Sequence, residues 1–271
     1  MPARSGLLER FPYSLSRWTD LPAAKWGWFQ ERLQQGQMAA IDPKTGAFDL
    51  WSLRPEDTLG MVFWTREPTN LILNKALLEP YKKVIHFTLT GWHEVESKAP
   101  TLRQGLDLLS RVVDAFGPSV VQWRFSPVPA VEDVVDRYQR IADHAIGLGL
   151  KDCFAAFLQN NDLMPELRSV EVRNQLLNSM VQAAPKLTLL LCNEDNTLRK
   201  AQEASRVKYA ICEDGSRFKG SCQTEGCGCA LAVDPFTVNE SCKFGCKYCY
   251  AADKDIAPKK HNTTRGLPVI Q

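Results

Sequence analysis

Long apolar runs are missing from this sequence. No stretch of its 271 residues approaches the roughly 18 consecutive apolar residues that a membrane-spanning helix needs. The first ten residues carry charges but lack the apolar core of a signal peptide. We therefore expect a cytoplasmic protein that has no membrane partner.

Strong net charge is missing as well. The sequence has 33 Lys and Arg against 31 Asp and Glu, which leaves a formal net charge of +2. A protein with so little net charge has no strong overall field, so a nucleic-acid partner would require a local basic patch that the sequence does not locate. Histidine is scarce, and the four histidines lack the spacing of metal ligands.

Cysteine is rare in the first two hundred residues and concentrated after them. Only Cys153 and Cys192 lie in the earlier part, whereas the other seven of the nine cysteines fall between Cys212 and Cys249. A disulfide framework would be spread more evenly along the chain. In a protein expected in the cytoplasm, this clustering favours metal or redox chemistry over disulfide bridges.

Short β-branched and aromatic runs alternate with longer amphipathic stretches, which predicts an α/β fold with a parallel sheet. About six βα units are expected, enough for a (β/α) barrel that is either partial or closed. The predicted strands are 11–16, 61–65, 84–90, 120–125, 153–158 and 187–192, and the predicted helices are 22–35, 102–116, 131–148 and 166–183.

The alternating pattern ends after Cys192. Residues 193–208 are mostly polar and are expected to be helical, and from Ala210 onward the chain is rich in Cys and Gly. No linker rich in Pro or Ser separates the two parts. We therefore divide the chain into a barrel, 1–204, and a cysteine-rich cluster-binding subdomain, 205–271, that packs on the barrel.

The most informative motif is a C-x3-C-x2-C pattern formed by Cys242, Cys246 and Cys249. Three thiolates can hold three irons of a [4Fe–4S] cluster and leave the fourth iron open for the amino and carboxylate groups of S-adenosylmethionine. Tyr248 is expected to cover the adenine of that cosubstrate. Zinc is the alternative ligand of this motif, although structural zinc sites favour paired C-x2-C spacings.

Several segments together resemble a known bacterial family, the domain of unknown function 1848. They are 16–20, 63–68, 87–91, 123–127, 227–229 and 242–251. The family's C-terminal cysteines are similar to the radical S-adenosylmethionine signature. The resemblance implies a barrel of radical S-adenosylmethionine type with the cluster loop near the C-terminus. Trp18 and Ser126 depart from the family pattern, which usually has Arg and Asp there, so we expect substrate contacts that differ from the family's.

Three charged residues near the predicted strand ends are candidate catalytic residues: Arg17, Asp20 and Arg124. Arg124 lies within an apolar strand, where an unpaired guanidinium would be costly. If Arg17 and Arg124 face a cavity, they would hold an anionic group of the cosubstrate or substrate. The alternative for Arg124 is an internal ion pair, with Asp20 as a candidate partner.

The remaining cysteines predict a second metal centre. Cys227 and Cys229 are the firmest candidate ligands, because the neighbouring glycines allow a tight turn in which both sulfur atoms approach one metal. Cys212 would contribute a third ligand, and Cys192 or Cys222 a fourth. The centre would be a second iron–sulfur cluster or a zinc ion, and reduced thiols without a metal remain the alternative.

These observations favour a radical S-adenosylmethionine enzyme that generates a 5′-deoxyadenosyl radical and acts on an unidentified substrate. Such an enzyme needs an external electron donor of flavodoxin or ferredoxin type. Two alternatives remain from other classes of protein. One is an iron–sulfur electron carrier or sensor, and the other is a zinc-stabilised module that binds nucleic acid.

Overall fold

The fold was analysed in a computed structural model of the chain. It describes residues 11–42, 45–158, 163–192, 206–212, 217–218, 228–236 and 242–249.

The fold is built on a seven-stranded sheet with the order β1-β4-β5-β6-β7-β8-β9. Every adjacent pair of strands in this sheet runs parallel. The sheet is open, with β1 and β9 at its edges. The strands are β1 (Tyr13–Leu15), β4 (Met61–Thr65), β5 (Lys83–Thr88), β6 (Val121–Val128), β7 (Asp152–Phe157), β8 (Thr188–Leu191) and β9 (Val207–Tyr209).

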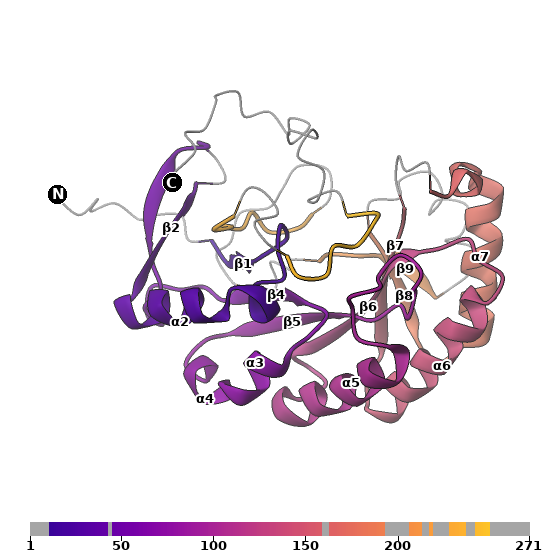
Figure 1. The fold of residues 1–271 in the computed structure, drawn as a ribbon, viewed down its shortest axis with the longest axis horizontal. Helices are drawn as coiled ribbons and strands as arrows, with labels where there is room; N and C mark the ends of the chain where they lie inside the picture. The colour runs from indigo at the N-terminus through magenta and orange to yellow at the C-terminus, as the bar shows by residue number, and fades with distance from the viewer. Residues whose placement is uncertain are drawn as a thin grey trace.

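Helices follow one another around one face of the sheet, as Figure 1 shows. They are α1 (Leu21–Ala24), α2 (Trp26–Gln35), α3 (Thr69–Leu73), α4 (Lys75–Leu78), α5 (Leu102–Phe116), α6 (Val134–Gly147) and α7 (Val170–Ala183), with a 3₁₀ turn at Pro165–Arg168. None of the helices in the described residues has both the length and the apolar character needed to cross a membrane.

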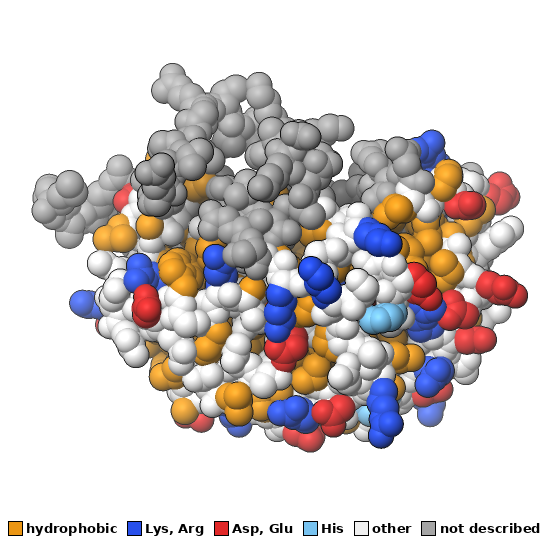
Figure 2. All heavy atoms as spheres, viewed as in Figure 1, with side chains coloured by type: hydrophobic (Ala, Val, Ile, Leu, Met, Phe, Trp, Pro, Cys, Tyr) orange, Lys and Arg blue, Asp and Glu red, His pale blue; other side chains and the backbone are white. Residues whose placement is uncertain are grey.

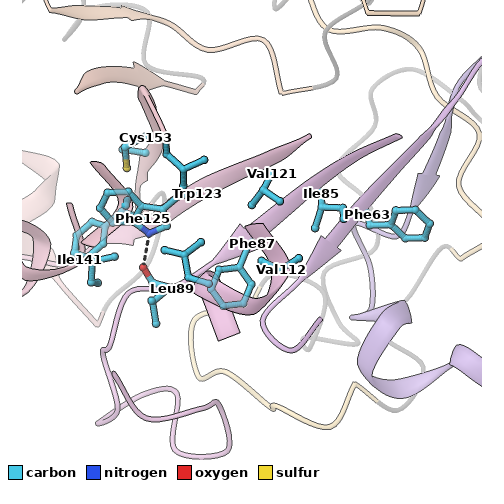
Figure 3. Close-up of a cluster of buried hydrophobic side chains, with 14 of the residues drawn as sticks. Phe63, Ile85, Phe87, Leu89, Val112, Val121, Trp123, Phe125, Ile141 and Cys153 are labelled. Carbon is cyan, nitrogen blue, oxygen red and sulfur yellow. Dashed lines mark hydrogen bonds between the residues drawn. The ribbon is translucent and has the colours of Figure 1, made fainter. Parts of the chain in front are cut away.

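The main core lies between the sheet and these helices. Alternate residues of β6 supply Val121, Trp123 and Phe125, and α5 supplies Leu109 and Val112. Figure 3 shows part of this cluster and the hydrogen bond in which the indole of Trp123 donates to the carbonyl oxygen of Leu89, at 3.0 Å. Burying each such side chain contributes about 1.5–3 kcal/mol.

The opposite face of the sheet is called here the inner face. Because successive side chains of a strand point to opposite sides, the residues between the core positions face inward. Trp64, His86, Arg124 and Phe154 occupy such positions on four neighbouring strands, β4 to β7. They contact one another through their rings and the guanidinium.

The predicted parallel α/β fold is confirmed, and the described residues form an open sheet instead of a closed barrel. Strand 61–65 and helix 102–116 have the predicted bounds. The helix begins sharply because Thr101 and Gln104 form a capping box, in which each side chain caps the other's backbone N–H. It ends at Gly117, whose φ of 85° suits glycine.

An antiparallel pair, β2 (Gln37–Ile41) with β3 (Phe48–Ser52), was not predicted. Its turn is stabilised by Asp42, whose carboxylate accepts a hydrogen bond from the backbone N–H of Thr45 at 2.8 Å, and by Gly46 with φ of 70°. The Asp-Pro-Lys-Thr-Gly sequence at 42–46 is a turn signal that could have indicated this hairpin.

Residues after 204 add to the sheet at both edges. The strand β9 extends it beyond β8, so strands continue past the point where the sequence pattern ends. At the other edge Val233 forms a parallel bridge with Tyr13, and its carbonyl oxygen accepts a hydrogen bond from the N–H of Ser14 at 2.8 Å. The division of the chain into a barrel, 1–204, and a cysteine-rich subdomain, 205–271, stays a prediction.

Candidate functional site

The described part of the cysteine motif, residues 242–249, is called here the cysteine loop. It contacts segments that follow β4 and β5: Arg66 comes directly after β4, and Trp92 and Glu96 belong to the segment after β5. In parallel α/β folds the loops after the strands build the functional site. The cysteine loop therefore lies at the edge of the sheet where folds of this class place their functional sites.

Tyr248 anchors the cysteine loop. Its hydroxyl donates a hydrogen bond to Glu96 and accepts one from the guanidinium of Arg66. Its ring stacks on Trp92, with ring centres 5.7 Å apart and planes 6° from parallel. One residue earlier, the N–H of Lys247 donates to the carbonyl oxygen of Val95 at 3.1 Å. Tyr248 was predicted to cover adenine, and in the structure its ring packs on protein.

Tyr248, Trp92, Arg66 and Glu96 are together called here the anchor, and they include a buried ion pair. Arg66 and Glu96 approach to 2.9 Å, and their side chains are only 12% and 3% exposed. The second carboxylate oxygen of Glu96 accepts a hydrogen bond from the hydroxyl of Thr90 at 2.5 Å. Sequence reasoning missed Trp92 and Glu96, because neither belongs to a motif and their role depends on a partner about 150 residues away.

Asp20 positions the segment that carries Arg66. Its carboxylate caps the short helix α1 by accepting from the N–H of Ala23 at 3.0 Å. It also accepts from the hydroxyl of Thr65 at 2.8 Å and from the N–H of Arg66 at 2.7 Å. Burial raises the pKa of Asp20 to about 6, although these hydrogen bonds oppose the shift. These contacts make Asp20 a positioning residue.

The backbone of the cysteine loop turns tightly between its second and third cysteines. The N–H of Cys249 donates to the carbonyl oxygen of Cys246 at 3.0 Å, and Gly245 adopts a left-handed conformation with φ of 53°. Cys246 is buried, whereas Cys242 and Cys249 are partly exposed. Burial raises the pKa of Cys246 to about 11, and the charge of Arg66 opposes this rise.

Within the described ranges, no three His, Cys, Asp or Glu side chains are grouped as ligands of a single metal ion. A zinc site would require three or four such side chains that converge on one ion. A cubane makes a different demand, because each thiolate binds a separate iron and the sulfur atoms lie further apart.

An open pocket of about 770 Å³ lies beside the cysteine loop. Lys243 and Phe244 of the loop line one part of it, and residues of α5 line another. Lys243 forms an ion pair with Glu67 at 3.3 Å. Figure 2 shows Lys and Arg side chains gathered on this face above α5. The volume is in the range of small-molecule pockets.

The two candidate arginines, Arg17 and Arg124, have different environments and different contacts. The side chain of Arg17 is exposed, and its backbone N–H donates to the carboxylate of Asp234 at 3.0 Å. Arg124 is half-buried on the inner face, with its guanidinium 4.9 Å from the ring centre of Trp64. One of its N–H groups donates to the sulfur of Cys212 at 3.4 Å.

Cys212 is the centre of a second group of cysteines. Its sulfur lies 3.3 Å from that of Cys192, and the thiol of Cys229 also forms a hydrogen bond with it. These two hydrogen bonds lower the pKa of Cys212 well below its usual value, with a further contribution from Arg124, although burial opposes the shift. Cys222 and Cys227 lie outside the described residues. The second metal centre stays a prediction.

His86 lies beneath this group. Its ring stacks on Trp64 with centres 4.3 Å apart, and its Nε2 lies 2.6 Å from the carbonyl oxygen of Cys212. Burial, together with the nearby charge of Arg124, lowers the pKa of His86 to about 3. The imidazole is therefore neutral at physiological pH and donates from Nε2.

The model of one protein family matches residues 13–251, and the chain therefore belongs to that family, described as a domain of unknown function (DUF1848). None of the curated proteins matches the chain.

Two solved enzyme structures show a weak likeness. A catalytic lysine mutant of Ruminococcus gnavus sialic acid aldolase is 16% identical, with a TM-score of 0.33 over 63% of this chain and 49% of its own. An N-terminal His-tagged D-allulose 3-epimerase from Methylomonas sp. is 20% identical, with a TM-score of 0.38 over 56% of this chain and 60% of its own. The match thus spans about half to three fifths of these enzymes.

Proposed function

We propose that this protein is a radical S-adenosylmethionine enzyme whose [4Fe–4S] cluster is held by Cys242, Cys246 and Cys249. The observation that carries the proposal is the anchoring of a three-cysteine loop at the carboxyl ends of parallel strands. Such a cluster, when bound, supplies the electron that cleaves S-adenosylmethionine into methionine and a 5′-deoxyadenosyl radical. The electron comes from an external donor of flavodoxin or ferredoxin type.

The residues around the loop have distinct tasks in this proposal. Tyr248, Arg66 and Glu96 hold the loop against the sheet, so that its cysteines keep a defined position. The positive charge of Arg66 near Cys246 opposes the rise in the pKa of that thiol caused by burial, and so assists formation of the thiolate that a metal ligand requires. The pocket lined by Lys243 and Phe244 provides room for a small molecule beside the loop.

Reconstitution with iron and sulfide under anaerobic conditions tests the proposal. We expect about four irons per chain and, after reduction with S-adenosylmethionine present, formation of 5′-deoxyadenosine, as one cubane predicts. Replacing Cys242, Cys246 or Cys249 by Ala should abolish both. Cys153→Ala is the matched control, because that thiol is fully buried in the main core, and it should leave both readouts intact.

Two results would contradict the proposal. One is formation of 5′-deoxyadenosine in Cys246→Ala at the wild-type rate, which would remove the loop from the reaction. The other is a stable, fully reconstituted cluster that binds no S-adenosylmethionine, which would favour an electron carrier or sensor instead.

A further inference from the structure

The second group of cysteines lies outside the cysteine loop and has no part in the proposed function. Cys192 directly follows β8, and Cys212 comes three residues after β9, the neighbouring parallel strand. Their sulfur atoms are 3.3 Å apart. Two sulfur atoms this close are in direct contact, and a disulfide of about 2.0 Å requires them to approach by only about 1.3 Å more.

The surroundings of Cys212 favour a thiolate. The guanidinium N–H of Arg124 donates to its sulfur at 3.4 Å, and this positive charge stabilises a negative sulfur in a site that is mostly shielded from water. Arg124 is itself held between the rings of Trp64 and Phe154, at 4.9 and 6.0 Å from their centres. The arginine is therefore positioned by packing.

The exposure of the three cysteines is uneven. Cys212 is 8% exposed, whereas Cys192 and Cys229 are partly exposed, so the group borders solvent. The described cysteines form no disulfide. Cys153 provides the contrast, because it is completely buried and burial raises its pKa above its usual value. Arg124 contacts the sulfur of Cys212, whereas Cys153 is enclosed in the core.

We propose that Cys192 and Cys212 are a redox-active thiol pair, in which hydrogen peroxide converts the contact between their sulfur atoms into a disulfide. The Cys212 thiolate attacks peroxide and becomes a sulfenic acid, releasing hydroxide. The thiol of Cys192 then attacks the sulfenic sulfur, the S–S bond forms, and the oxygen leaves as water after taking up a proton. The two thiols lose two electrons, which reduce one peroxide to two waters.

The disulfide would join the end of β8 to the segment that follows β9, directly above the inner face. His86 is hydrogen bonded to the carbonyl oxygen of Cys212, so the covalent link would also fix this buried histidine. Arg124 acts in this proposal as a positioning residue for the thiolate and does not hold the substrate.

Tryptic digestion separates the relevant cysteines cleanly. Peptide 187–199 contains only Cys192, peptide 209–217 contains only Cys212, and peptide 220–243 contains the cysteines at 222, 227, 229 and 242. The full-length protein, purified anaerobically, is treated with hydrogen peroxide, alkylated and digested without reduction. Mass spectrometry should find peptide 187–199 linked to peptide 209–217.

Variants separate this proposal from the proposed function and from simple proximity. The link should form at the wild-type rate in the Cys242/Cys246/Cys249→Ala protein, whatever becomes of its cluster. Cys229→Ser should still form the link, because its hydroxyl can replace the thiol as a hydrogen-bond donor to Cys212. Arg124→Met should slow formation of the link, because the sulfur of Cys212 loses the guanidinium that stabilises its thiolate. Arg124→Lys, which keeps the charge, should recover part of the rate.

Three results would overturn the proposal. The first is that both thiols stay alkylatable after peroxide treatment of folded wild-type protein. The second is a link between peptides 209–217 and 220–243 instead. The third is protection of both thiols by bound zinc or iron that persists in the Cys242/Cys246/Cys249→Ala protein, which would establish a metal centre. If Arg124→Met does not fold, wild type and Cys229→Ser decide the question.

Discussion

Removing Arg66 tests how strongly the cysteine loop's anchor depends on its ion pair. In Arg66→Met the long apolar stem is kept, but Glu96, whose side chain is 3% exposed, loses its positive partner. Breaking a buried ion pair from one side costs about 3–5 kcal/mol. Thr90 and Tyr248 still donate to Glu96, so we expect the lower end of this range.

The assay is thermal unfolding of the metal-free protein, followed by circular dichroism. For proteins of this size about 1 kcal/mol corresponds to a shift of roughly 2–4 °C, so a loss of about 3 kcal/mol lowers Tm by roughly 6–12 °C. The double variant Arg66→Met/Glu96→Gln should recover part of this loss, because it no longer buries an unpaired charge.

Arg111→Met is the matched control for this experiment. Arg111 pairs with Asp107 on the exposed surface of α5, at 3.8 Å and with side chains 46% and 68% exposed. Exposed pairs contribute about 0–1 kcal/mol. If the Tm of Arg66→Met is no lower than the Tm of this control, the claim that the buried pair stabilises the anchor is refuted.

Three further predictions concern stability. A histidine whose folded pKa is about 3 contributes to folding above pH 6.5, and this contribution is lost as the pH falls from there towards 3. In His86→Gln the free energy of unfolding should therefore depend less on pH between 6.5 and 3, and an unchanged dependence would contradict the prediction. Asp20 has the opposite effect, because its folded pKa of about 6 lies above the ordinary 3.8. Its contribution to stability is present below pH 3.8 and is lost as the pH rises towards 6. Asp20→Asn should remove this dependence of the unfolding free energy on pH, which denaturant titrations at several pH values measure. Gly60→Ala would place its Cβ 2.1 Å from the ring of Phe218, so we expect a loss of about 1–3 kcal/mol, which a smaller residue in the double variant Gly60→Ala/Phe218→Leu should partly restore.

Elements whose apolar residues follow a regular pattern along the chain could be predicted from the sequence. The strand 61–65 is a continuous apolar run, and the helix 102–116 has an apolar face together with a capping residue at one end and glycine at the other. The strand β9 was missed because three residues, of which only Val207 is buried, give no periodic signal. Its place in the sheet is decided by pairing with β8.

The candidate site was predictable in its cysteines but not in their surroundings. The spacing of Cys242, Cys246 and Cys249 is visible along the chain, whereas the contact of Tyr248 with Arg66 joins residues 182 positions apart. Arg124 was expected to face a partner or a polar cavity, and the structure places the sulfur of Cys212 against it. Contacts between distant segments leave no spacing in the sequence from which they could be inferred.

The anchor at Tyr248 also sets an order of events during synthesis. Its partners Arg66 and Glu96 leave the ribosome long before the cysteine loop, since 182 and 152 positions separate them from Tyr248. All seven strands of the sheet precede the loop in the chain. The cysteine loop is therefore synthesised after every strand of the described sheet and after both partners of Tyr248.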